Sequence, residues 1–289
     1  MKNDHVKLRQ ADRGKLLYHY TKSNGINGIM TSNCFWATKS DFLNDPNEFL
    51  HIKEIVYSVC DDYIPDKEMR RNFIEDILEE NVIVTGGGDR EYFVLSFSNC
   101  PDSITMWSEF GAKTGYNISF ESDKIVKRIQ ESNIIDYHGF VIYNREVQER
   151  IIWEILRDIL PKCFHMPFHE ILKLGRKNRK DPIYQKACEK FQKIAAVYAM
   201  FFKDEAFAQE EEYRFIFEKQ LDTQVHFREK DGFMIPYIEV QLSQQRLPVM
   251  GIVVAPQNHI DLAKKGMEYM IRSQGYEVEV SLSNIKLRY

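Results

Sequence analysis

The sequence predicts an α+β fold: one domain over residues 1–289 with a helical insert at about residues 145–209. Runs rich in β-branched and aromatic residues lie near the N-terminus and again in the last third of the chain, which favours strands there. Helical periodicity dominates the middle. Strands and helices do not alternate regularly, and no repeat or low-complexity linker separates them, so we expect one core.

The N-terminal half is predicted to contain strands and short helices. They are a strand at Leu16–Tyr20, a helix capped by Thr21 or Ser23, a strand at Phe35–Thr38, a helix from Asp45, a helix at about Asp66–Asn81, and strands at Glu91–Ser98, Tyr116–Phe120 and Tyr137–Tyr143. The start at Asp45 is the best specified, because Asp45 can cap the helix, Pro46 suits its first position and Glu48 closes a capping box.

The C-terminal half begins with two predicted helices and then returns to strands. We expect helices at about Arg145–Leu160 and Pro182–Phe207, strands at Glu212–Phe217, Phe233–Val240, Val249–Ala255 and Tyr276–Leu282, and one helix at about Ile260–Gln274. The second helix carries an apolar stripe that includes Phe191 and Phe201, so it is expected to be well buried.

Composition and charge exclude several classes of protein. The 39 basic and 43 acidic side chains give a net charge of −4, which disfavours a protein coated in nucleic acid but permits a local basic patch. The apolar stretches are too short to span a membrane, and no apolar segment follows the N-terminus. The 5 cysteines are scattered without a Cys-x-x-Cys pair, so we expect a reduced, cytoplasmic protein.

Two patterns that resemble ligand motifs fail on local grounds. His165 and His169 have the spacing of a metal pair on a helix, but Pro167 between them breaks that helix, so no metal is expected. Gly86–Gly88 precede a strand, whereas a phosphate loop needs a helix behind its glycines.

Three short motifs remain as candidates for chemistry: Tyr18-His19-Tyr20-Thr21, then Ser96-Phe97-Ser98 followed by Met106–Phe110, and finally Glu210–Arg214. Each also has a plain structural interpretation. His19 suits a half-buried core histidine, Trp107 suits packing, and Glu210–Glu212 suits a solvated acidic turn.

Taken in order, these motifs resemble the family called domain of unknown function 2971. Asn44-Asp45-Pro46, Ile252–Pro256 and Ser283–Arg288 fit the same family, so the resemblance extends from about Leu16 to the C-terminus. That family in turn is similar to ADP-ribosyltransferases. The resemblance therefore implies a split antiparallel sheet that holds NAD as a substrate.

The resemblance also implies roles for individual residues. The implied residues are His19, Tyr20 and Thr21 for the adenosine ribose, Ser96, Ser98, Trp107 and Phe110 for nicotinamide, and Glu212 with Glu210 for the reacting ribose and the acceptor. Phe110 stands where the family is expected to have Tyr. A carboxylate at Glu212 would stabilise the positive charge that develops as the glycosidic bond breaks. On an extended backbone Glu210 would share its face.

The acceptor and the partners stay open. Lys173, Arg176, Lys177, Arg179 and Lys180 form a basic run without acidic residues, which indicates a nucleic-acid contact or else a solvated loop. The leading hypothesis is an ADP-ribosyltransferase that acts as a toxin or anti-phage defence effector and modifies nucleic acid or protein. A regulatory protein is a candidate partner. The alternatives are an NAD glycohydrolase on the same site and a non-catalytic nucleic-acid-binding or sensor module.

Overall fold

The chain divides into two compact units. The computed structural model describes residues 5–43, 48–78, 91–111, 115–230, 232–242, 246–256 and 260–286. One unit, here the helical unit, comprises Met1–Leu8, Ser40–Tyr92 and Val141–Ala208, and the other, the sheet unit, comprises Arg9–Lys39, Phe93–Phe140 and Gln209–Tyr289. Asp45, Pro46 and Gly86–Gly88 lie outside the described residues.

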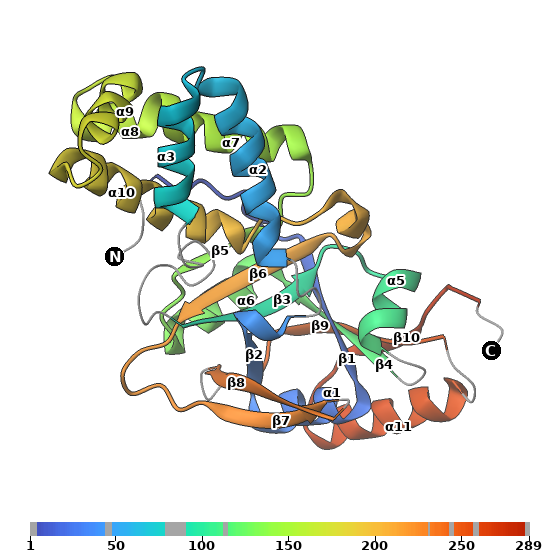
Figure 1. Cartoon of the computed structure of the whole chain (residues 1–289). Coiled ribbons are helices and arrows are strands. Elements are labelled where there is room, and N and C mark those ends of the chain that lie inside the picture. The colour runs from blue at the N-terminus through green and yellow to red at the C-terminus, as the bar shows by residue number, and fades with distance from the viewer. Residues whose placement is uncertain are drawn as a thin grey trace. The chain divides into compact units, whose positions relative to one another are not determined.

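The helices of the helical unit, which are drawn as ribbons in Figure 1, pack around aromatic side chains. Its elements are α2 (Glu48–Tyr63), α3 (Lys67–Leu78), α7 (Arg145–Glu154), a π-helical turn (Ile155–Ile159), α8 (Leu160–Phe164), α9 (Phe168–Lys177) and α10 (Pro182–Ala199). The buried ring of Phe73 lies 5.3 Å from that of Phe168 and 5.6 Å from that of Phe191. No described helix is long and apolar enough to cross a membrane.

Two helix predictions in this unit need correction. The helix predicted at Pro182–Phe207 ends at Ala199, because the following backbone turns to pair with Ile142, whose N–H donates to the carbonyl of Phe201 at 2.7 Å. The basic run, for which a solvated loop was the alternative, is helical as far as Lys177, with Pro167 at the N-cap of α9, whereas Arg179 and Lys180 lie in the turn before α10. The residues between Pro167 and Asn178 have strong helical amphipathicity, which the basic run obscured.

The sheet unit is built on one large, mostly antiparallel sheet. Its strands are β1 (Leu16–Lys22), β2 (Cys34–Lys39), β3 (Tyr92–Ser98), β4 (Gly115–Glu121), β5 (Tyr137–Phe140), β6 (Glu212–Glu218), β7 (His226–Lys230), β8 (Phe233–Gln241), β9 (Val249–Val254) and β10 (Glu279–Leu282). The order is β10-β9-β4-β1-β3-β2-β8-β7, with β5 and β6 attached through β3. Only the β9–β10 pair among the registered pairs is parallel. The predicted α+β class is confirmed.

The sheet branches at β3, which has three partner strands. Tyr18 of β1 pairs with Ser98, at the end of β3, whereas Thr38 of β2 pairs with Val94 nearer its start. The third partner is β6. A strand has two edges, and β6 takes one edge of β3. β1 and β2 therefore pair with successive stretches of the other edge and separate from each other at Leu95–Phe97. We call this opening the β1–β2 fork.

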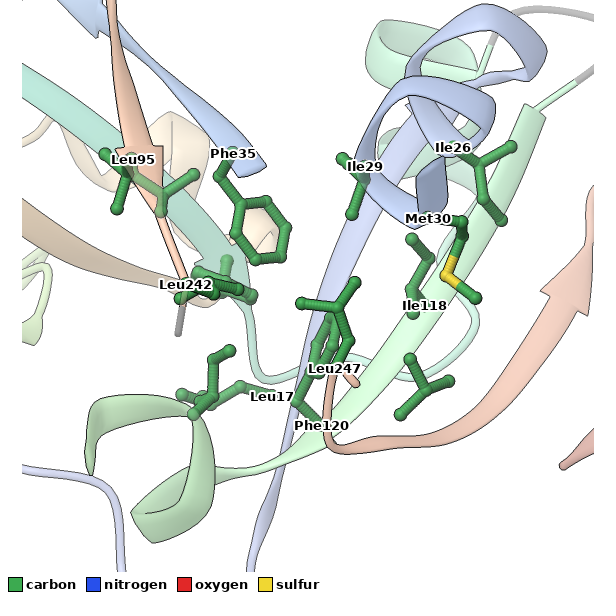
Figure 2. Packing of buried hydrophobic residues seen from close by; sticks show 14 of the residues in the cluster. Leu17, Ile26, Ile29, Met30, Phe35, Leu95, Ile118, Phe120, Leu242 and Leu247 are labelled. Carbon is green, nitrogen blue, oxygen red and sulfur yellow. The ribbon is translucent and has the colours of Figure 1, made fainter. Parts of the chain in front are cut away.

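The main core covers one face of this sheet (Figure 2). Leu17, Phe35, Ile118 and Phe120 pack there against Ile26, Ile29 and Met30 of α1 (Ser23–Ser32), together with α6 (Ser122–Ser132) and α11 (Ile260–Ser273). Because side chains alternate along a strand, Tyr18 and Tyr20 point to the opposite face. A smaller cluster of Tyr20, Met106, Trp107 and Ala255 lies on that second face.

Candidate functional site

The three sequence motifs lie on three neighbouring strands, β1, β3 and β6. The end of β3 is joined to the start of β6: the Ser98 hydroxyl donates to the carbonyl of Glu210 at 2.7 Å, and the N–H of Asn99 donates to the carbonyl of Glu211 at 2.9 Å. The same Ser98 oxygen accepts from the N–H of Cys100 at 3.0 Å. Ser98 is fully buried, so the hydroxyl fixes the backbone of both motifs.

A buried ion pair opens β6. The guanidinium of Arg214 donates to the carboxylate of Glu212 at 2.7 Å, and the two residues are 1% and 8% exposed. Tyr213 and Phe215 lie in the main core, so Glu212 and Arg214 point to the opposite face, as Ser98 does relative to Phe97. This is the second face of the sheet, opposite the main core, and we call it the polar face. The ion pair holds one carboxylate oxygen of Glu212 in a fixed position.

Glu210 does not follow the alternation that the sequence suggested. It ends a 3₁₀ segment (Glu205–Glu210), and Glu211 then adopts a left-handed conformation with φ of 43°. The prediction that Glu210 and Glu212 share a face assumed an extended backbone, and that assumption is wrong. Glu210 is nevertheless buried, and its carbonyl is the acceptor for Ser98. A left-handed non-glycine residue between two buried carboxylates is typical of a constrained site.

His19 lies at the β1–β2 fork. Its Nδ1 is 3.0 Å from the carbonyl oxygen of Ser96, and its ring lies 5.1 Å from Phe35 and 5.3 Å from Phe97. Because a carbonyl only accepts, Nδ1 carries the proton and Nε2 is left as an acceptor. Burial lowers the pKa of His19 to about 4, helped by the nearby charge of Arg228 and opposed by the Ser96 bond. The imidazole is therefore neutral at pH 7.

The predicted site residues divide between the two faces of the sheet. His19 points to the face that carries Phe97, and Thr21 packs there against Gly25 at the start of α1. Ser98 and Glu212 share the polar face, and Ser96 alternates with Phe97 toward it. The structure thus joins the serine and glutamate motifs through Ser98 and Glu210, and the histidine motif adjoins the serine motif through the Tyr18–Ser98 pairing and the contact of His19 with the Ser96 carbonyl.

Tyr20 and Trp107 form a packed pair on the polar face. Their rings lie 4.7 Å apart at 71°, and Phe110 packs against them. The Tyr20 hydroxyl donates to the carbonyl of Cys100 at 2.8 Å and accepts from the N–H of Ser103 at 3.2 Å. Burial raises the pKa of Tyr20 well above its usual value. Trp107 is 1% exposed, so the indole is part of the packing.

Asp102 organises this region and was missed at the sequence level. Its carboxylate accepts from Trp107 Nε1 at 2.6 Å, from the Ser283 hydroxyl at 2.7 Å and from the N–H of Asn284 at 2.8 Å. The Asn-Cys-Pro-Asp-Ser stretch indicates only a turn, because nothing in it shows that residues 283–284 return to this point.

Two of the motifs lie in a segment that matches a protein family. A family model, described as "Protein of unknown function (DUF2971)", matches residues 106–215. This match supports the resemblance to that family of unknown function over the matched residues. It contains Met106-Trp107 and Glu210–Arg214, whereas His19 and Ser96–Ser98 lie outside it. No curated protein and no solved structure matches the chain.

Most of the basic run is paired with carboxylates of the helical unit. Lys173 pairs with Glu170 at 2.7 Å, and Arg176 pairs with Asp66 at 2.9 Å. Arg179 bonds Asp76 and lies 3.1 Å from Glu75. Among the residues that the structure describes, Lys177 and Lys180 are the cations of the run that form no ion pair. The predicted nucleic-acid contact stays a prediction, since the pairs offset much of the charge it needs.

The two histidines at 165 and 169 lie on different helices. His165 ends α8 in a left-handed conformation with φ of 51°, and Pro167 caps α9, which contains His169. The break at Pro167 is therefore as the sequence predicted. Across the described ranges, no group of three or more His, Cys, Asp or Glu side chains is placed to hold a metal.

Proposed function

We propose that this chain transfers ADP-ribose from NAD to an acceptor. One observation carries the proposal: motifs separated by almost two hundred residues lie on the adjoining strands β1, β3 and β6 of a branched, mostly antiparallel sheet. The Ser98–Glu210 hydrogen bond fixes the last two motifs against each other. A buried, oriented carboxylate beside them supplies the group that such a reaction needs.

Glu212 is the proposed catalytic residue. Cleavage of the bond between nicotinamide and ribose places positive charge on the ribose, as in other glycosyl transfers. A carboxylate that accepts a hydrogen bond from the ribose 2′-hydroxyl stabilises that charge more strongly as it grows, so the interaction lowers the barrier. The hydrogen bond from Arg214 holds the Glu212 carboxylate in one orientation, and the carboxylate stays on the polar face. Glu210 is the proposed group that orients or deprotonates the acceptor.

His19 is proposed to bind the adenosine ribose at the fork. Its Nδ1–H is already used by the carbonyl of Ser96, so Nε2 accepts a hydrogen bond from a ribose hydroxyl. The lowered pKa suits this role, because a neutral imidazole keeps Nε2 free of a proton at pH 7. The ring is clamped between Phe35 and Phe97, which fixes its direction.

The test is to incubate purified protein with NAD labelled in its adenylate part, with and without cell extract, and to measure nicotinamide, free ADP-ribose and macromolecular label. Transfer predicts nicotinamide release together with label on a protein or nucleic acid. Free ADP-ribose without any macromolecular label would instead show a glycohydrolase. Absence of nicotinamide release under every condition would overturn the proposal in favour of a binding module.

A further inference from the structure

Arg228 on β7 carries a guanidinium that the protein itself does not satisfy. Its Nη2 donates to the hydroxyl of Thr38 at 2.8 Å, but its buried Nε has no hydrogen-bond partner among the residues that the structure describes. Within the described ranges, no carboxylate lies within 4.0 Å of this group, whereas the buried Arg214 is paired with Glu212. Burial accordingly lowers the pKa of Arg228.

An unpaired guanidinium in this setting is costly, since a half-buried charge loses hydration without gaining a counter-ion. An anion would remove that cost. The guanidinium presents its donors in a plane, which matches the oxygens of a phosphate or diphosphate better than it matches a single neutral acceptor.

Aromatic rings surround the guanidinium. The ring of Trp36 is 4.5 Å from that of Tyr237 at an angle of 32°, and the ring of His226 stacks on Tyr237 at 5.5 Å. The guanidinium carbon lies 5.7 Å from the Trp36 ring centre and 5.8 Å from that of Tyr237. Trp36 is 41% exposed, which is high for a tryptophan on a sheet. An exposed indole beside an arginine is suited to stacking a nucleobase next to its phosphate.

This cluster lies on the polar face. Phe35 and Ala37 point into the main core, so Trp36 and Thr38, which alternate with them, point to the face that carries Ser98 and Glu212. The strands from the glutamate motif to Arg228 are neighbours in the order β6, β3, β2, β8 and β7. The Arg228 guanidinium bonds Thr38 of β2, so it lies about two strand spacings, or about 10 Å, from β6, a distance that the diphosphate and the nicotinamide ribose of one dinucleotide can bridge.

We propose that Arg228, Trp36 and Tyr237 form a subsite for a nucleoside diphosphate, with the diphosphate on the guanidinium and the base on Trp36. The identification of that ligand as the ADP half of NAD rests on the proposed function. The subsite lies outside the three motifs and outside the residues that the family model matches.

The experiment measures ADP binding to the full chain by calorimetry, for the parent protein and for Arg228→Gln, Arg228→Lys and Trp36→Leu. We expect Arg228→Gln to weaken ADP about tenfold or more, and Arg228→Lys to weaken it less because it keeps the charge. Trp36→Leu should weaken ADP but leave the much weaker binding of inorganic diphosphate unchanged. Lys264→Gln is the matched control, since it removes one charge from α11, whose buried residues Met267 and Ile271 pack in the main core on the other face.

The outcomes separate this proposal from the proposed function. If ADP does not bind, or if Arg228→Gln binds it as well as Lys264→Gln does, the subsite is overturned, whatever happens to NAD. If ADP binding depends on Arg228 and Trp36 but nicotinamide is never released, the subsite stands and the transferase proposal fails. Melting temperatures of all variants are compared, and a variant that unfolds is replaced by Thr38→Val, which removes the hydroxyl that accepts the hydrogen bond from the guanidinium.

Discussion

The hydroxyl of Ser98 donates a 2.7 Å hydrogen bond to the carbonyl oxygen of Glu210, 112 residues further along the chain. This contact joins the end of β3 to the start of β6 at the point where Glu211 takes its left-handed conformation. It therefore sets where Glu212 enters its strand. The Ser-Phe-Ser motif acts on the glutamate motif through the backbone, and a ligand is not needed to explain the burial of Ser98.

Replacement of Ser98 by alanine is expected to destabilise the protein by about 1–3 kcal/mol, because it leaves the Glu210 carbonyl and the Cys100 N–H without their buried partner. Chemical denaturation measures the change. Ser96→Ala is the matched control: only the backbone carbonyl of Ser96 makes the contact with His19, so that variant should change stability by less than about 0.5 kcal/mol. Equal losses in the two variants would contradict this account.

Asp102→Asn is expected to loosen the segment at Ser283–Ile285. The carboxylate accepts three hydrogen bonds, whereas an asparagine offers one acceptor oxygen and presents an N–H₂ group to donors. Hydrogen exchange should show faster exchange at the amide of Asn284 and a loss of about 2 kcal/mol in stability. Unchanged protection at Asn284 would show that other contacts hold this segment.

Stability should fall as the pH is lowered from about 6.5 to about 4, through the protonation of His19. The folded-state pKa is lowered to about 4 from 6.5, so the unfolded chain binds more protons in this window. The free energy of unfolding therefore decreases on acidification, by up to about 3 kcal/mol. Denaturation curves at several pH values should show a shallower dependence for His19→Gln. The same slope in both proteins would exclude His19 as the source.

Arg179→Gln is expected to act on the stability of the helical unit rather than on charge-driven binding. Arg179 bonds Asp76 and lies 3.1 Å from Glu75, so its loss removes the cation beside Asp76 and leaves Glu75 with Arg71 at 3.9 Å. We expect a cost of about 1 kcal/mol. Lys177→Gln removes the same charge without these bonds and should be neutral. A larger effect of Lys177→Gln on nucleic-acid affinity would instead favour a binding interface on α9.

Local signals identified most elements of the fold but not how they meet. The short runs rich in apolar and aromatic residues at Leu16–Tyr20 and Glu212–Phe217 correctly indicate β1 and β6. The branch at β3 has no local signature, since it depends on which stretches of β3 pair with Tyr18 and Thr38. The helix α9 and the strand β7 were missed for another reason, because both are short and their many charged residues obscure the apolar pattern.

The candidate site shows the same limit. The order of the motifs predicts that the Ser98 and Glu212 motifs lie close together. The structure adds that Ser98 contacts the glutamate motif through the carbonyl of Glu210. The left-handed turn at Glu211 could not be inferred, because three consecutive glutamates give no turn signal. Arg228 escaped notice because an isolated arginine in a charged strand is usually solvated, and its burial is a property of the assembled sheet.

The most direct test of the account is the rate of nicotinamide release from NAD by the parent protein, Glu212→Gln and Glu211→Gln, each checked for an unchanged melting temperature. Glu212 is buried and ion-paired on the polar face, whereas Glu211 is its exposed neighbour of identical chemistry. The account predicts that Glu212→Gln lowers the rate by a factor of 100 or more, about 2.7 kcal/mol of barrier, while Glu211→Gln stays within about threefold of the parent. Equal rates for the two variants would contradict it.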